Sequence, residues 1–97
     1  MTNSLVSVQI IPTVPEGEHV YDFVDAAIAL IEEAGLKYEV NALDTTVEGD
    51  LHDVLPLIEK MNNKMVALGA PKIISQIKIL HVPTGIEIET LTGKYRQ

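Results

Sequence analysis

The 97-residue sequence contains no cysteine, and aromatic residues make up only 4% of it. Without cysteine the chain has no disulfide framework and no thiolate chemistry, which fits a reducing compartment. No apolar run approaches the roughly 18 residues of a membrane-spanning helix, and the N-terminus lacks the basic-then-apolar layout of a signal peptide. We therefore expect a cytoplasmic protein.

Basic residues are also few. Lys and Arg total 7 against 14 Asp and Glu, which gives a net charge of −7. An acidic domain repels phosphate backbones, so we expect no nucleic-acid partner. Because no apolar run is long enough to span a membrane, we expect no membrane partner either. The same field favours a small cation, although salt screens exposed charge.

Histidine is scarce as well, and its three positions are scattered. His19, His52 and His81 fall in a loop, at a helix start and at a strand end, without the i, i+4 spacing of metal ligands. A catalytic dyad is not visible in the sequence. We therefore expect no metal site, no cofactor and no enzymatic activity.

Apolar residues, by contrast, recur at regular spacings along most of the sequence. Alternation with a period of two predicts strands, and spacing of three and four predicts helices. The length suggests one domain over residues 1–97. The predicted elements are a strand over 5–11, a helix over 18–34, strands over 36–41 and 45–49, a helix between 50 and 68, and a strand over 72–82.

Two boundaries stay open at this point. Pro56 conflicts with a helix start at Asp50, because its missing N–H would fall beyond the first turn. A start near Asp53 would place Pro56 in that turn, where proline is tolerated. The segment 86–97 is short and polar, and it fits an edge strand, a frayed helix or a tail.

The order β-α-β-β-α-β predicts the α+β, ferredoxin-like arrangement, an antiparallel sheet with two helices on one face. In that topology the strands are ordered 4-1-3-2. The helix-facing side takes Val6, Val8, Ile10, Val47, Ile77 and Ile79; the open side takes Ser7, Gln9, Thr46, Glu48, Gln76 and Lys78, with an apolar rim of Leu5, Ile11, Ile74 and Leu80.

A sheet face with a polar centre and an apolar rim suggests an interface or a ligand groove. Three alternatives stay open: a solvated face, a face covered by a second subunit, and a small-molecule pocket formed at that packing. Glu48 is the critical residue, because a charge in mid-strand needs a partner. That partner is water, a ligand with a hydrogen-bond donor, or Lys78 as a salt partner.

Three segments together resemble a known family. They are the first strand ending in Ile10-Ile11-Pro12, the segment Ala34–Val40, and Thr45-Thr46-Val47-Glu48-Gly49-Asp50-Leu51. From about Ser4 to Leu80 the chain resembles the thiamine-binding family of small proteins, also called DUF77 or UPF0045. The resemblance implies a ferredoxin-like fold, dimers and usually tetramers assembled through sheet contacts, and binding of thiamine (vitamin B1) or its hydroxymethylpyrimidine part without known catalysis.

The resemblance also implies a site. The Thr-x-x-Glu-Gly signature of the family corresponds to Thr45, Glu48 and Gly49, with Gly49 expected to leave room beside the carboxylate. A carboxylate accepts hydrogen bonds from an aminopyrimidine, a charge-assisted interaction. Gln9, Ser7 and Thr46 can donate or accept beside it. An aromatic ring suits the cationic thiazolium, and the candidates are Tyr21 and Tyr38, the latter with core packing as the alternative.

Two other functions remain open beside a ligand-binding homo-oligomer. One is a purely oligomeric regulatory or interaction protein, which predicts a filled sheet face without a cavity. The other is a cofactor-free enzyme, since ferredoxin-like folds host several chemistries.

Overall fold

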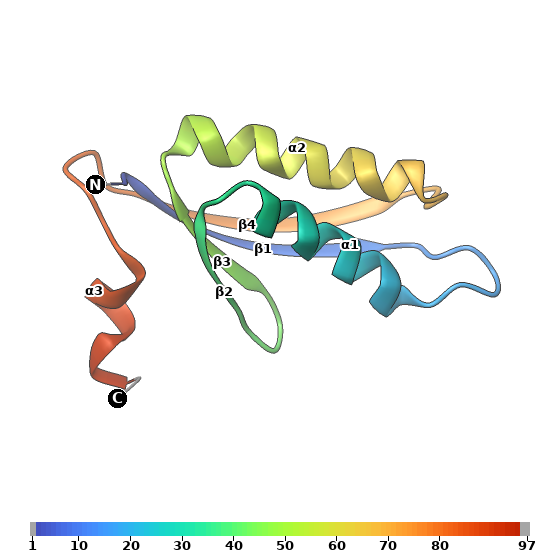
Figure 1. Ribbon diagram of the computed structural model, residues 1–97, viewed down its shortest axis with the longest axis horizontal. Helices are drawn as coiled ribbons and strands as arrows, with labels where there is room; N and C mark the ends of the chain where they lie inside the picture. The colour runs from blue at the N-terminus through green and yellow to red at the C-terminus, as the bar shows by residue number, and fades with distance from the viewer. Residues whose placement is uncertain (1, 96–97) are drawn as a thin grey trace.

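A four-stranded antiparallel sheet with two helices packed on one face forms the body of the molecule (Figure 1). The computed structural model describes residues 2–95. The strands follow one another across the sheet in the order β2-β3-β1-β4, as predicted. The elements are β1 Ser4–Pro12, α1 Val20–Glu33, β2 Lys37–Val40, β3 Thr45–Gly49, α2 Leu51–Ala67, β4 Ile73–His81, α3 Ile88–Thr92 and a 3-10 turn Gly93–Tyr95.

The core lies between the sheet and the two long helices. Val6 and Val8 on β1 and Val47 on β3 are buried, which confirms the predicted strand register. Val6 lies opposite Val47 in the β1–β3 ladder, so the central strands present one apolar face. They pack against Phe23, Ala27 and Ile31 of α1 and Val54, Leu57, Ile58, Met61 and Met65 of α2.

Strand β4 is covered less than its sequence suggests. Ile77 and Ile79 lie opposite Val8 and Val6 and so face the helix side, as predicted. They nevertheless stay 41% and 43% exposed. The helices pack over the central strands, and β4 lies at the edge of the sheet.

Helix α2 starts at the earlier of the two positions that the sequence left open. Leu51 is its first residue, so Pro56 lies beyond the first turn. A partner distant in sequence stabilises this start: the Leu51 N–H donates to Asn3 Oδ1 at 2.9 Å, and the Asn3 N–H donates to Asp50 Oδ1 at 3.1 Å. Hydrogen bonds to otherwise unpaired N–H groups at a helix start stabilise it.

The C-terminal segment is a short helix, one of the three alternatives for residues 86–97; residues 96 and 97 lie outside the described part of the chain. In Figure 1, α3 lies apart from α1 and α2. The Ile86 N–H donates to the Thr2 carbonyl at 2.9 Å, so the segment is tied to the start of the chain. Ile88 is only 2% exposed.

Among the described residues, no helix combines the length and apolar character that crossing a membrane requires.

Candidate functional site

A notch in the sheet beside β1 is the feature from which the candidate site is built. Strand β1 pairs with β4 as far as Pro12, but it pairs with β3 only as far as Val8. The β2–β3 hairpin ends early, and its turn residues Asn41–Asp44 lie where further strand would be. Residues 9–12 of β1 therefore have no β3 neighbour.

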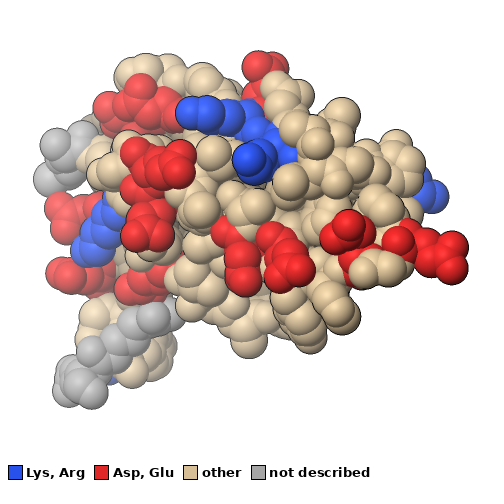
Figure 2. Space-filling view, turned by 45° about the vertical axis from the view of Figure 1, so that its right-hand side comes forward, with Lys and Arg blue, Asp and Glu red and all other residues tan. Residues whose placement is uncertain are grey.

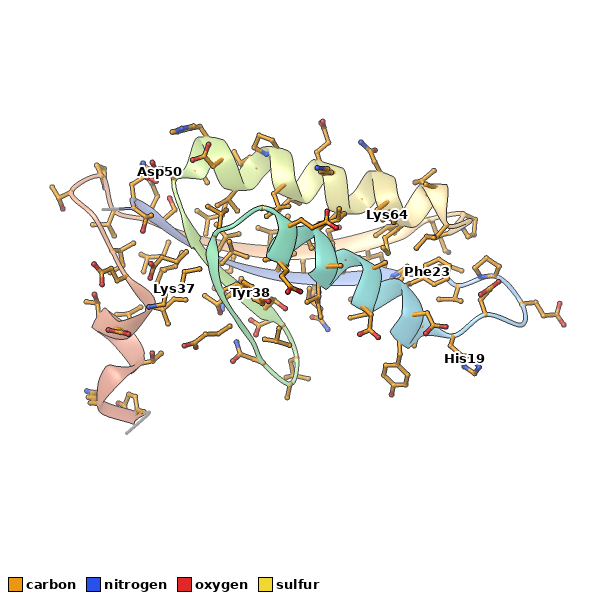
Figure 3. All side chains as sticks on the ribbon, in the orientation of Figure 1. His19, Phe23, Lys37, Tyr38, Asp50 and Lys64 are labelled. Carbon is orange, nitrogen blue, oxygen red and sulfur yellow. The ribbon has the colours of Figure 1, made fainter. Side chains whose placement is uncertain are left out.

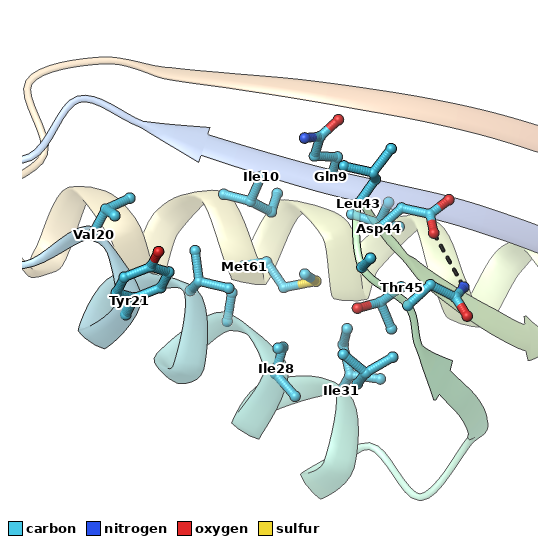
Figure 4. Close-up of a pocket in the computed structure, with 16 residues that line it drawn as sticks. Gln9, Ile10, Val20, Tyr21, Ile28, Ile31, Leu43, Asp44, Thr45 and Met61 are labelled. Carbon is cyan, nitrogen blue, oxygen red and sulfur yellow. Dashed lines mark hydrogen bonds between the residues drawn. The ribbon is translucent and has the colours of Figure 1, made fainter.

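Two cavities meet at this notch. The first, of about 280 Å³, lies on the helix side and is mostly apolar (Figure 4). The second, of about 230 Å³, lies on the open side. Both are lined by Gln9, Leu43 and Asp44. An apolar cavity with a few convergent polar groups is the usual form of a small-molecule site.

Asp44 is the charged group at the junction. Its carboxylate accepts a hydrogen bond from the Ser7 hydroxyl and a second one, of 3.1 Å, from the Asn41 amide. These two bonds, chiefly that from Ser7, lower the pKa of Asp44 below its usual value, and the charge of Lys78 adds to the effect. Asp44 is thus an ionised carboxylate in a fixed position (the dashed line in Figure 4 marks the Asn41 bond).

Three of the predicted site residues gather around Asp44 on the open side. Ser7 binds it directly, and Gln9 lines the same cavity. Thr46 lies opposite Ser7 in the ladder, and its hydroxyl is 3.4 Å from the Asn41 amide nitrogen. Gln76 and Lys78 of β4 complete the wall.

Glu48 lies farther along β3, opposite Leu5. Its Oε1 accepts a hydrogen bond of 2.7 Å from the backbone N–H of Ile88, so the C-terminal segment reaches over this end of the open face. This also explains why Leu5, predicted to be an exposed rim residue, is only 7% exposed. The ligand-binding role of Glu48 stays a prediction.

The salt bridge considered between Glu48 and Lys78 is not formed among residues 2–95. The ladders align Lys78 with Ser7, two residues away from the Leu5 position that faces Glu48. Strand β1 also separates the two side chains. Lys37, opposite Glu48 on β2, pairs instead with Glu89 at 3.4 Å, which raises the pKa of Lys37 (Figure 3 shows Lys37 between the hairpin and α3).

The other predicted site residues lie on the helix side of the sheet. Thr45 is buried and lines the apolar cavity. Tyr38 lies opposite Val47 and packs against the core. Core packing was the alternative to a ligand contact for this residue. The reason given for Gly49 is wrong: a Cβ there would lie 3.0 Å from Val54 and 3.2 Å from Leu36, so this glycine allows α2 to approach the sheet.

The sequence analysis missed both residues: it placed Asp44 in a turn and Asn41 at the end of the strand 36–41, whereas β2 ends at Val40. The sequence did contain one signal for these two residues. Asn41 and Asp44, whose side chains can bond to each other, flank the two turn residues Ala42 and Leu43 of the hairpin. Tyr21, the other aromatic candidate, lines the apolar cavity and is 77% exposed.

One group of potential metal ligands lies elsewhere, at the start of α2. Ligand atoms of Asp50, His52 and Asp53 lie within 4.8 Å of one another. His52 and Asp53 are exposed, and Asp50 already accepts the Asn3 N–H. This group does not contribute to either cavity.

The charge distribution agrees with the sequence. Figure 2 shows acidic side chains spread over the face toward the viewer, with fewer basic ones among them. The surplus of acidic residues creates a field that favours a cationic ligand.

The order of elements, the strand order and the placement of both long helices on one face define a ferredoxin-like α+β protein. Within that class, the chain belongs to the thiamine-binding protein family, whose model matches residues 6–96. The resemblance noted in the sequence is thereby confirmed.

Comparisons with individual proteins support the same family assignment. A UPF0045 protein of Clostridium perfringens is 38% identical over 91 residues, 94% of this chain and 95% of the relative. The structure of a DUF77 domain from Bacillus cereus matches with a TM-score of 0.92 at 33% identity, covering 99% of this chain and 92% of that one. A candidate thiamine biosynthesis/salvage protein of Thermotoga maritima matches with a TM-score of 0.88 at 31% identity, covering 97% and 99%.

Proposed function

We propose that this protein is a non-catalytic binder of thiamine or its hydroxymethylpyrimidine part, and that it works as a homo-oligomer, a dimer or a tetramer. The observation that carries the proposal is the ionised carboxylate of Asp44 at the junction of two cavities. Family membership supports the choice of ligand.

The chemistry of the notch suits an aminopyrimidine. Such a ring offers an exocyclic amine and a ring nitrogen that can carry a proton, and a carboxylate binds both through charge-assisted hydrogen bonds. Asp44 is positioned for this by Ser7 and Asn41. Gln9 adds a group that can donate and accept. The apolar cavity lined by Ile10, Ile28 and Met61 can accept the flat body of a ring (Figure 4).

The cationic thiazolium of thiamine would lie in the acidic field of the protein, with the exposed ring of Tyr21, which lines the apolar cavity, as its stacking partner. The purely oligomeric alternative predicted a face without a cavity, and the two cavities argue against it.

Calorimetric titration with thiamine and with hydroxymethylpyrimidine tests the proposal. Asp44→Asn keeps the size of the side chain and removes its charge, and we expect it to weaken binding about tenfold to a hundredfold, the effect of losing one charge-assisted hydrogen bond. Glu48→Gln makes the same change at Glu48, the carboxylate that the sequence predicted to bind the ligand. A thermal shift measurement adds an independent readout, since a ligand that binds only the folded state raises the Tm.

The proposal fails if wild-type protein shows no heat of binding and no change in Tm with either compound. If Glu48→Gln loses affinity while Asp44→Asn keeps it, the ligand lies under the C-terminal segment and not in the notch.

A further inference from the structure

The open-side cavity contains a cation that the proposed function does not use. Lys78 lines this cavity, and of the described residues that line either cavity it alone is a lysine or an arginine. Its ammonium group takes part in no salt bridge within residues 2–95. Lys37, at the opposite edge of the sheet, is by contrast already paired with Glu89. The charge of Lys78 is therefore available to a ligand.

Two amide groups accompany Lys78 on the same face of the sheet. Gln9 and Gln76 lie directly opposite each other in the β1–β4 ladder, and both line the open-side cavity. Lys78 follows Gln76 by two residues, and the Cβ atoms of such diagonal neighbours lie about 7–8 Å apart. Within residues 2–95 neither side-chain amide forms a hydrogen bond. The three side chains can all donate to one group placed between them.

The hydroxyl of Ser7 is not one of these available donors. Its proton already bonds to Asp44, whose ionised carboxylate can only accept. The cavity thus presents an acceptor at the notch and donors along β4. A ligand that uses both needs a donor and an acceptor joined by a short link.

A phosphorylated aminopyrimidine has this layout. In hydroxymethylpyrimidine the ring carbon next to the one that bears the amine carries the hydroxymethyl arm. A phosphoryl group on that arm lies only one carbon and one oxygen beyond the ring. At neutral pH a phosphate monoester carries a charge of about −1.5 to −2 and three acceptor oxygens. Lysine binds such a group as a point charge, and amides can donate to its other oxygens.

We propose that the open-side cavity is a phosphate subsite, and that the protein prefers the monophosphate ester of hydroxymethylpyrimidine to the free compound. This rests on the proposed function, because the amine of the ring is taken to bind Asp44. Lys78 binds the phosphoryl group, and Gln9 and Gln76 donate hydrogen bonds to it.

The acidic character of the chain does not prevent this binding. Exposed charges farther away than about 8 Å are largely screened at physiological salt. Of the residues that line the open-side cavity, Asp44 is the acidic one. A ring that carries a proton pairs with Asp44 and offsets its charge, so the ring and the phosphoryl group support each other's binding. Inorganic phosphate lacks the ring and should bind weakly.

Thiamine meets a different constraint in the same place. Its methylene carries the thiazolium cation where the ester carries phosphate, and Lys78 repels a cation. Turning the pyrimidine over exchanges its two bonds to the carboxylate oxygens of Asp44 and points the methylene the other way. The thiazolium then lies toward Tyr21, at the other end of the apolar cavity from Asp44 (Figure 4). Lys78 thus distinguishes the two ligands by charge.

Replacing Lys78 tests the phosphate subsite. Lys78→Gln keeps a hydrogen-bond donor and removes the charge. Lys72→Gln makes the same change just before β4, at an exposed residue that lines neither cavity. Calorimetry gives the ratio of the affinities for the ester and for free hydroxymethylpyrimidine. We expect a ratio of about ten in the wild type and in Lys72→Gln, and a loss of this preference in Lys78→Gln.

Two further measurements probe the same contact. Gln76→Met removes an amide donor at similar length and should weaken binding of the ester about threefold, the effect of one neutral hydrogen bond. Raising the salt from about 50 mM to about 500 mM should reduce the preference for the ester, because salt screens the pair of Lys78 and phosphate. Circular dichroism checks the fold of every variant. A preference that resists both changes would place the phosphoryl group outside the cavity.

Thiamine and inorganic phosphate are the comparison ligands. Thiamine should bind Lys78→Gln at least as tightly as Lys72→Gln, and a weaker affinity would contradict the orientation with the thiazolium toward Tyr21. Inorganic phosphate should not match the ester in affinity. If it binds wild-type protein as tightly as the ester and fails to bind Lys78→Gln, the cavity takes free phosphate and the preference for the ester is overturned.

Failure of the subsite and failure of the proposed function give different results. If wild-type protein binds thiamine and hydroxymethylpyrimidine without preferring the ester, or if Lys78→Gln keeps the preference, the subsite is overturned and the proposed function stands. If wild-type protein binds neither thiamine nor free hydroxymethylpyrimidine, the proposed function is overturned. Binding of the ester that Lys78→Gln abolishes would then still support the subsite.

Discussion

At the scale of single residues, Asp44 shows how two local hydrogen bonds define a charged site. The Ser7 hydroxyl and the Asn41 amide both donate to its carboxylate, and both stabilise the ionised form. The pKa of Asp44 is therefore lower in the folded protein than in the unfolded chain, where it is about 3.9. The folded state consequently binds fewer protons at this group.

This difference predicts the acid dependence of stability. The contribution of Asp44 is fully present above about pH 4 and is lost as the pH falls through the lowered folded-state pKa. Ser7→Ala removes the main cause, so its free energy of unfolding should fall less between pH 7 and pH 3 than that of the wild type. Solvent screening keeps the difference below about 1 kcal/mol.

Urea unfolding at several pH values measures this effect. Thr13→Ala, which removes an exposed hydroxyl, is the matched control and should follow the wild type. Identical pH dependence in Ser7→Ala and wild type would show that the Ser7 bond does not control the titration of Asp44.

At the scale of elements, the junction of β3 and α2 depends on close packing. Gly49 is buried at the end of β3, where its Cα faces Val54 of α2 and Leu36 before β2. A strand passing directly into a helix brings the two backbones close together, and a residue without a side chain suits that approach.

Gly49→Ala tests this packing. The added Cβ would lie 3.0 Å from Val54 Cγ2 and 3.2 Å from Leu36 Cδ1. We expect a loss of about 1–3 kcal/mol in the free energy of unfolding, as for other overpacked cores. Gly93→Ala is the control, because its Cβ meets nothing within 4 Å and its backbone is helical. If Gly49→Ala and Gly93→Ala had the same free energy of unfolding, the packing of Val54 and Leu36 against Gly49 would not require a residue without a side chain.

At the scale of the whole molecule, the C-terminal segment joins parts of the chain that are far apart in sequence. Ile88 contacts Glu48 of β3 through its N–H, Glu89 pairs with Lys37 of β2, and Ile86 binds the backbone of Thr2. The segment thus covers one end of the open face, while the notch stays accessible at the other end.

Ile88→Ala should loosen this cover. Because Ile88 is 2% exposed, its truncation should lower the free energy of unfolding by about 2–4 kcal/mol if the C-terminal segment stays bound to the sheet. The loss is smaller if the segment detaches. Amide hydrogen exchange should accelerate over residues 86–95 and at Leu5. Lys37→Ala, which removes an exposed ion pair, should change stability by under about 1 kcal/mol. Unchanged exchange over 86–95 in Ile88→Ala would contradict this role.

The sequence alone determined the order of the elements, the strand order and the face on which each core residue of the central strands lies. The elements and their faces depend on local periodicity: alternation separates Ser7 from Val8, and three-and-four spacing aligns Phe23, Ala27 and Ile31. The strand order followed from the fold class that the order of the elements predicts. The resemblance to the thiamine-binding family also depended on short local segments. Part of the site followed as well, because Ser7, Gln9 and Thr46 share one face by alternation.

The tertiary structure alone decided which partner each polar group finds. Glu48 binds Ile88, which is 40 residues away, and Leu51 at the start of α2 binds Asn3, which is 48 residues away. Asp44 became part of a site because the hairpin ends four residues before β1 does. Such contacts depend on where whole elements stop and dock, and periodicity within one segment carries no information about that.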